Sequence, residues 1–328
     1  MKLVTYVHNG TQKAGALVGR ADDRVLDLQA AGGGDAAFAN VLALIEGGER
    51  VWDKAKGLAA KAGGDHEVAL KDVRLLTPVP NPPQVRDFLC FEEHLLNSFA
   101  MLRKTRAAAE PDPAAALARY EREGLFVPPK IWYEQPLYYK PSRFGIIGTD
   151  EDTLWPWFSN RMDYEMEFGC FLGKSGKDVT PEEAKGLIFG YSIFNDMSAR
   201  DTQAYEMPAG FGPGKGKDFE TGNIIGPCIV TADAFDPYKQ EMIVRINGKE
   251  RSRGKSGGMH WSFEQCIAHT SRSERVHPGE FFASGTVGLG CGLEHGIFLE
   301  PNDLIELEVT GIGVLRNRIV RKDPPRKS

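Results

Sequence analysis

Cysteines, long apolar runs and excess positive charge are all scarce in this chain of 328 residues. Its five cysteines are scattered, odd in number and without the spacing of a metal site. The sequence therefore predicts reduced thiols and no disulfide framework. No apolar run approaches the roughly 20 residues that a membrane-spanning helix needs. The net charge of -5 gives no reason to expect nucleic acid or an anionic membrane as a partner.

Two familiar sequence signals are also missing. Residues Met1–Val7 enter a strand-like pattern directly and do not have the layout of a signal peptide, so we expect a cytoplasmic protein. The loop Phe211–Thr221 is rich in glycine and lysine but lacks the Walker spacing, and by motif it is not a phosphate loop. Such a segment is most often a solvated loop, although Lys217 within it would be able to stabilise an anion.

The composition favours a folded protein with two parts. Hydrophobic residues make up 41% of the chain and charged residues 26%, which suits a sizeable core. The proline-rich segment Leu75–Pro83 marks a boundary, so we expect a small β-rich N-terminal domain over residues 1–78 and a catalytic domain over 79–328. An alanine-rich helix is expected near 36–61. Residues 98–130 predict either two helical pieces or a flexible insertion, which would form an insertion or lid over the site.

Residues 161–173 alternate between acidic and apolar side chains. Asp163, Glu165 and Glu167 lie two apart, and residues two apart in a strand point to the same face. Glu165 and Glu167 are therefore expected side by side, where their charges repel each other. A hard divalent cation such as Mg²⁺, Mn²⁺ or Ca²⁺ would remove that cost. The alternative is the solvated polar face of an edge strand.

Other polar side chains stand where predicted strands give way to helices or loops. Asp87 precedes a strand-to-helix transition whose first helical turn is predicted to carry Glu92, Glu93 and His94. Histidine is the side chain best suited to proton transfer near neutral pH, although a lone helical histidine is more often a surface or packing residue. Asp196 ends a hydrophobic strand, where it would serve as a third oxygen ligand or as a helix N-cap.

These features form one ordered pattern between about residues 84 and 317. Its motifs are Asp-Phe-(five residues)-His from Asp87, Tyr-Glu-Met-Glu from Tyr164, Asn-Asp-Met-Ser-Ala-Arg-Asp-Thr-Gln from Asn195, Lys-Asp-Phe-Glu-Thr from Lys217, Met-His-Trp-Ser from Met259, Pro-Gly-Glu-Phe-Phe-Ala-Ser-Gly-Thr from Pro278, and Phe-Leu-Glu-Pro-Asn-Asp from Phe298. With these motifs in this order, the sequence resembles the fumarylacetoacetate hydrolase family.

The resemblance implies a fold and a set of site residues. The fold would be α+β, mostly β, with a mixed β-roll that buries the site, in a homodimer. The cofactor would be a divalent cation, with Mg²⁺ preferred over Mn²⁺ or Ca²⁺. By motif, the family's metal ligands correspond to Asp87, Glu165, Glu167 and Asp196. The catalytic histidine corresponds to His94, and the remaining catalytic and substrate-binding residues correspond to Arg200, Gln203, Lys217 and Thr286.

The resemblance also implies a hydrolase acting on C–C bonds in ketonic substances. The expected substrate is a 1,3-diketo acid similar to fumarylacetoacetate or an acylpyruvate, as in aromatic catabolism. It would be cleaved through a metal-bound enolate by water that His94 activates. Lys217 would add a fixed positive charge, while Gln203 and Thr286 would orient substrate oxygens.

Two other functions are compatible with the sequence. One is a 2-oxo-acid decarboxylase or isomerase of the same family, acting on oxaloacetate or on aromatic meta-cleavage intermediates. The other is a non-catalytic, metal-dependent binding protein. The sequence also departs from the shorter family members, which pair the histidine with an acid three residues later, because that position holds Asn97. Candidates for the missing acid are Glu92, Glu93 and Glu294.

Overall fold

Two sheets organise the molecule, whose computed structural model describes residues 1–322. Within that range, a 12-stranded sheet follows the order β4 (Glu67–Ala69), β3 (Arg24–Asp27), β2 (Thr11–Val18), β1 (Lys2–His8), β14 (Asn223–Thr231), β12 (Ile188–Asp196), β11 (Met166–Leu172), β17 (Phe281–Ala283), β6 (Val85–Phe88) and β7 (Tyr138–Tyr139), with β5 (Arg74–Leu76) beside β1 and β8 (Ile146–Ile147) beside β14. A five-stranded sheet follows the order β16 (Lys249–Lys255), β15 (Glu241–Ile246), β18 (Leu304–Val309), β19 (Gly313–Arg321) and β9 (Asp152–Trp155).

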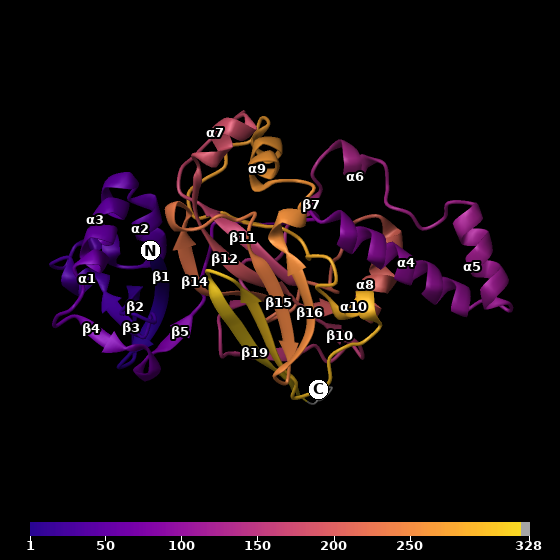
Figure 1. Cartoon of the computed structure of the whole chain (residues 1–328), viewed down its shortest axis with the longest axis horizontal. Helices are drawn as coiled ribbons and strands as arrows, with labels where there is room; N and C mark the ends of the chain where they lie inside the picture. The colour runs from indigo at the N-terminus through magenta and orange to yellow at the C-terminus, as the bar shows by residue number, and fades with distance from the viewer. Residues whose placement is uncertain (323–328) are drawn as a thin grey trace, which may run out of the picture.

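The two sheets bury different fractions of their strands. Every residue of β11 and β12 is buried, because the small sheet contacts this centre of the large sheet (Figure 1). Strand β18 instead alternates buried and half-buried residues, as expected where one face of a sheet meets solvent. Most neighbouring strands are antiparallel, but β17–β6 and β14–β8 in the large sheet and β19–β9 in the small sheet are parallel. The expected α+β, mostly β fold with a mixed sheet is therefore confirmed.

The N-terminal strands extend the large sheet, because β1 pairs antiparallel to β14. They carry the helices α1 (Leu28–Ala31), α2 (Val41–Glu46) and α3 (Glu49–Ala60) (Figure 1). The single helix expected near 36–61 is wrong: a short 3₁₀ turn, α2 and α3 share this segment. Gly48 separates α2 from α3 with a φ of 73°, a conformation that glycine adopts without strain. The domain boundary at 78/79 stays a prediction.

Two helices occupy the predicted insertion. Helix α4 (Glu92–Ala108) begins where the sequence predicted a helix start, and α5 (Pro113–Arg122) packs against it through a small apolar cluster around Ala107, Ala116 and Tyr120. Figure 1 shows this helix pair projecting away from the sheets. The pair is followed by α6 (Ile131–Glu134). The role of residues 98–130 as a lid over the site stays a prediction.

Short elements near the ends of the central strands complete the fold. Helix α7 (Pro181–Lys185) follows Thr180, whose side chain caps its N-terminus. The strand pair β10 (Met162–Asp163) and β13 (Ser198–Ala199) leads into α8 (Arg200–Glu206). Helices α9 (Phe263–Ser271) and α10 (Gly292–His295) come from the C-terminal third. Among residues 1–322, no helix combines the length and apolar character needed to cross a membrane.

Candidate active site

Three carboxylates from three strands of the large sheet meet in the interior. Asp87 lies on β6, Glu167 on β11 and Asp196 at the end of β12. The strand order brings them together, since β11 pairs with β12 on one side and reaches β6 through β17 on the other. One carboxylate oxygen from each residue lies within 4.8 Å of the others, and the three side chains are 5%, 1% and 0% exposed, respectively.

This cluster has the donors that a divalent cation needs. Asp87 Oδ1, Glu167 Oε2 and Asp196 Oδ1 are buried and have no hydrogen-bond partner. Burial, and then the charge of Asp196, raises the pKa of Asp87. Burial, and then the charges of Asp87 and Asp196, raises the pKa of Glu167. Unpartnered, buried carboxylate oxygens are costly unless they are protonated or coordinate a metal, so these three residues fit a hard divalent ion.

Glu165 lies beside this cluster but has other partners. Lys217 Nζ lies 2.5 Å from Glu165 Oε2, and Arg200 Nη2 lies 2.7 Å from Glu165 Oε1. Burial alone would raise the pKa of Glu165, but these two cations lower it below the ordinary value. Both oxygens of Glu165 are therefore paired with cations, unlike those of the three converging carboxylates. The role of Glu165 as a fourth ligand stays a prediction.

Lys217 also reaches the cluster, because its Nζ lies 2.6 Å from Asp196 Oδ2. The side chain is 2% exposed. Burial lowers the pKa of Lys217, but Asp196 and Glu165 outweigh that effect and raise it. The predicted lysine of the glycine-rich loop is thus a buried cation that offsets part of the carboxylate charge.

Tyr139 is a site residue that the sequence reasoning missed. It lies on β7 opposite Asp87 on β6, and its hydroxyl donates a hydrogen bond of 2.7 Å to Asp196 Oδ2. Together with Lys217, this contact occupies one oxygen of Asp196 and leaves the other facing the cluster. The aromatic segment before residue 140 gave no signal that singled out this tyrosine.

His94 forms a hydrogen-bonded pair with Glu294. Its Nδ1 lies 2.8 Å from Glu294 Oε1, and α4 and α10 bring the two side chains together. Glu294 Oε2 accepts hydrogen bonds from Asn97 Nδ2 (2.9 Å) and the backbone N–H of Leu289 (2.8 Å). Burial alone would raise the pKa of Glu294, but the hydrogen bond and charge of His94, together with these donors, lower it. Of the three candidate acids, the structure therefore places Glu294 beside the histidine.

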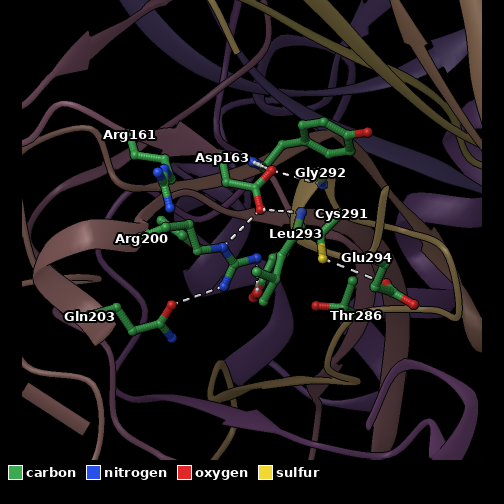
Figure 2. Close-up of polar contacts among 12 residues, drawn as sticks. Arg161, Asp163, Arg200, Gln203, Thr286, Cys291, Gly292, Leu293 and Glu294 are labelled. Atoms are coloured by element: carbon green, nitrogen blue, oxygen red, sulfur yellow. Dashed lines mark hydrogen bonds and ion pairs between the residues drawn. The ribbon is translucent and has the colours of Figure 1, made fainter. Parts of the chain in front are cut away.

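The remaining predicted residues lie around these two groups. Arg200 Nη1 donates to Gln203 Oε1 (2.9 Å), and both residues extend from α8 (Figure 2). Thr286 Oγ1 donates to Glu167 Oε1 over 3.4 Å. Thr286 thus contacts a carboxylate of the cluster and Gln203 contacts Arg200, while the roles of both residues in substrate binding stay predictions.

Comparison with known proteins identifies the family. A family model described as fumarylacetoacetate (FAA) hydrolase C-terminal matches residues 113–320. The chain belongs to the fumarylacetoacetate hydrolase family. The matched part of this family member includes the glutamates of residues 161–173, Lys217 and Glu294, whereas Asp87 and His94 precede it.

Relatives of this family member carry several different names. An uncharacterized protein of Pyrococcus abyssi is 34% identical over 207 residues, which are 63% of this chain and 87% of the relative. A human mitochondrial oxaloacetate tautomerase is 29% identical over 193 residues, which are 57% of this chain and 60% of the relative.

Solved structures of the family have the same fold. A fumarylacetoacetate hydrolase from Exiguobacterium antarcticum is 24% identical with a TM-score of 0.74, and the match covers 98% of this chain and all of that protein (100%). A maleylpyruvate hydrolase from Sphingobium sp., described in complex with manganese(II) ion and pyruvate, is 20% identical with a TM-score of 0.71 and the same coverage of both chains. At these identities the likeness shows the shared fold.

Proposed function

We propose that this chain is a metal-dependent hydrolase that cleaves a C–C bond in a 1,3-diketo acid resembling fumarylacetoacetate or an acylpyruvate. The observation that carries the proposal is the His94–Glu294 pair together with the cluster of Asp87, Glu167 and Asp196. His94 is within electrostatic range of Glu165, which shares Lys217 with Asp196 of the cluster. A base and a group of metal-type ligands in one buried site suit an enzyme that activates water next to a polarised carbonyl.

The histidine is set up to accept a proton. When Nδ1–H donates to Glu294 Oε1, the free lone pair of His94 lies on Nε2. His94 would take a proton from water through that atom, and Glu294 would hold the ring and stabilise the imidazolium that forms. The resulting hydroxide would attack the carbonyl, and the bond to the neighbouring carbon would break with its electron pair on the leaving carbon. That leaving enolate would take the proton back from the His94 imidazolium, which restores the neutral histidine.

The carboxylates and cations of the site prepare it for an ion and an acidic substrate. Asp87, Glu167 and Asp196 would hold the ion, with Mg²⁺ as the proposed species and Mn²⁺ or Ca²⁺ as alternatives. When bound, the ion supplies Lewis-acid polarisation of a substrate carbonyl oxygen. Lys217 and Arg200 offset the charge of Glu165, which keeps the total negative charge low enough for an anionic substrate to enter.

A second candidate is a tautomerase or isomerase of a 2-oxo acid. The human relative that is named an oxaloacetate tautomerase favours it. The same His94–Glu294 pair would then move a proton between a carbon and an oxygen of the substrate, and no water would be consumed. Decarboxylation of oxaloacetate belongs to the same candidate, because it also proceeds through an enolate.

The discriminating experiment follows several acids in parallel. Purified protein with Mg²⁺ is mixed with a panel of acylpyruvates, fumarylacetoacetate and oxaloacetate, and the enol absorbance and the products are followed with and without EDTA. EDTA-sensitive cleavage of a diketo acid into two acids is expected. Equilibration of enol and keto oxaloacetate without cleavage would replace the hydrolase by the tautomerase, and CO₂ release from oxaloacetate by the decarboxylase.

Matched variants connect the activity to the site. His94→Gln should lower turnover by on the order of 100-fold or more. Glu92→Gln should not, because Glu92 is on the same helix but bonds to Tyr133 at the surface. No turnover of any acid by the metal-loaded protein would leave the non-catalytic binding protein. We also propose that the protein is a homodimer that works in the cytoplasm. Light scattering of the purified protein tests the dimer.

A further inference from the structure

Asp163 connects parts of the site without facing the carboxylate cluster. It lies at the end of β10 and is 0% exposed. Its Oδ1 accepts hydrogen bonds from the backbone N–H groups of Tyr164 (2.9 Å) and Gly292 (2.8 Å), and its Oδ2 accepts one from the backbone N–H of Leu293 (2.9 Å). Figure 2 shows Asp163 between Arg200 and the first residues of α10.

Arg200 anchors the Asp163 carboxylate from the other side. Its Nε donates to Asp163 Oδ2 over 2.7 Å, while its Nη2 lies 2.7 Å from Glu165 Oε1. The guanidinium is always protonated in proteins, so the buried negative charge of Asp163 is compensated. Each Asp163 oxygen therefore accepts two hydrogen bonds, and every partner is a donor.

The backbone at residue 292 is shaped for this contact. A Cβ added at Gly292 would lie 2.5 Å from Asp163 Oδ1 and 2.2 Å from the backbone oxygen of Ile297. Real Cβ atoms do not approach other atoms so closely. Glycine is thus required where the carboxylate approaches the chain, which is a second observation that this contact is built into the fold.

The segment that Asp163 holds leads directly to the catalytic pair. Residues 292 and 293 immediately precede Glu294, whose carboxylate lies 2.8 Å from His94 Nδ1. We infer that Asp163 is the positioning residue for the His94–Glu294 pair: it fixes the backbone from which Glu294 extends, and Arg200 fixes Asp163. This inference rests on the proposed role of His94 as the base.

The test replaces the carboxylate by an amide. In Asp163→Asn one of the two oxygens becomes an NH₂ group, which cannot accept a hydrogen bond. Depending on the orientation of the amide, either Tyr164 and Gly292 or Leu293 and Arg200 lose their acceptor. We expect kcat to fall by about 10- to 100-fold with KM nearly unchanged, because a misplacement of about 1 Å costs on the order of 100-fold. In Asp163→Asn/Glu294→Gln we expect no more than about a twofold loss beyond Glu294→Gln alone, since both changes remove the same positioning.

A spectroscopic readout distinguishes positioning from general destabilisation. The Nδ1–H of His94 should give a low-field proton signal in the metal-loaded wild type, assigned by its loss in His94→Gln. It should be lost or broadened in Asp163→Asn and kept in Asp201→Asn. Asp201 is the matched control, because it also accepts backbone hydrogen bonds, from Asn160 and Thr202, but bonds to neither residue 292 nor residue 293.

The outcomes separate this inference from the proposed function. An unchanged His94 signal in folded Asp163→Asn, or losses that multiply fully in the double variant, would overturn the positioning role. The signal needs no turnover, so it decides the question even where the panel of acids shows no hydrolysis. If Asp163→Asn does not fold, Gly292→Ala disturbs the same contact from the backbone side, and the same signal is read.

Discussion

Replacing Glu294 by glutamine tests the acid–base pair most directly. Glu294 Oε2 accepts from Asn97 and from the backbone N–H of Leu289, and Oε1 accepts from His94. A glutamine has one acceptor oxygen and one NH₂ group. If the oxygen faces Leu289, the NH₂ group faces His94, whose Nδ1 must then accept, and the ring proton moves to Nε2. The atom proposed as the base would be blocked.

The opposite orientation of the glutamine is the costly one. With the oxygen toward His94, the Leu289 N–H is left without an acceptor, and an unsatisfied buried donor costs about 1–3 kcal/mol. Since about 1.4 kcal/mol corresponds to a factor of ten, the active tautomer falls by roughly 10- to 100-fold from this energy alone. Loss of the carboxylate charge adds to this, and a general base contributes about 10²–10⁴ in rate in total.

We therefore expect Glu294→Gln to lower kcat by on the order of 100-fold or more. The assay is steady-state turnover, at saturating Mg²⁺, of the acid that the wild type consumes, with Glu92→Gln as the control. His94→Gln should show a similar loss, and the double variant should lose little beyond either single change. Turnover within about threefold of wild type by a folded, metal-loaded Glu294→Gln would refute the reasoning.

Three further predictions concern the carboxylates and their ion. Glu167→Gln should weaken Mg²⁺ binding, measured by calorimetry, more than Glu165→Gln does. The reason is that Glu167 has an unpartnered oxygen, whereas both oxygens of Glu165 are paired. Equal losses of Mg²⁺ affinity in the two variants would mean that Glu165 is an equal ligand. Lys217→Met should destabilise the metal-free protein by about 3–5 kcal/mol, the cost of leaving a buried charge unpaired, measured by urea unfolding; a change below about 1 kcal/mol would mean that Lys217 balances no buried charge. The raised pKa values of Asp87 and Glu167 mean that the metal-free folded state holds protons at pH values where the unfolded chain has lost them. The stability that these protonated carboxyls contribute is lost as the pH rises through the raised pKa values, so the gain in Tm on adding Mg²⁺ should be larger at about pH 8 than at about pH 6. A gain in Tm that does not depend on pH would contradict this prediction.

The sequence predicted the parts of the site that lie on regular elements. The strand end at Asp87, the helix start at Glu92 and the strand end at Asp196 are all local patterns of hydrophobicity and capping, and the structure has each of them. Periodicity also placed Glu167 on a strand. Such signals depend on neighbours within a few residues, which is why they survive in a single sequence.

Contacts between distant segments were harder to predict. Tyr139 reaches Asp196, and Glu294 reaches His94 across 200 positions of the chain. The pattern of residues 161–173 grouped Asp163, Glu165 and Glu167 as equivalent, yet they have three different sets of partners, because strand β10 ends at Asp163 and β11 begins only at Met166. Nothing in the local spacing separates these three acids.

The proposed base His94 and the carboxylate cluster lie on secondary-structure elements of different kinds. Asp87, Glu167 and Asp196 belong to strands in one hydrogen-bonded sheet, whereas His94 is carried by α4, whose main contacts among the described elements are with α5 and α10. Substitutions in these helices can therefore alter proton transfer while the ligand set stays intact. In this chain, proton transfer at His94 and ion binding at the three carboxylates would therefore respond separately to changes in the helices and in the sheet.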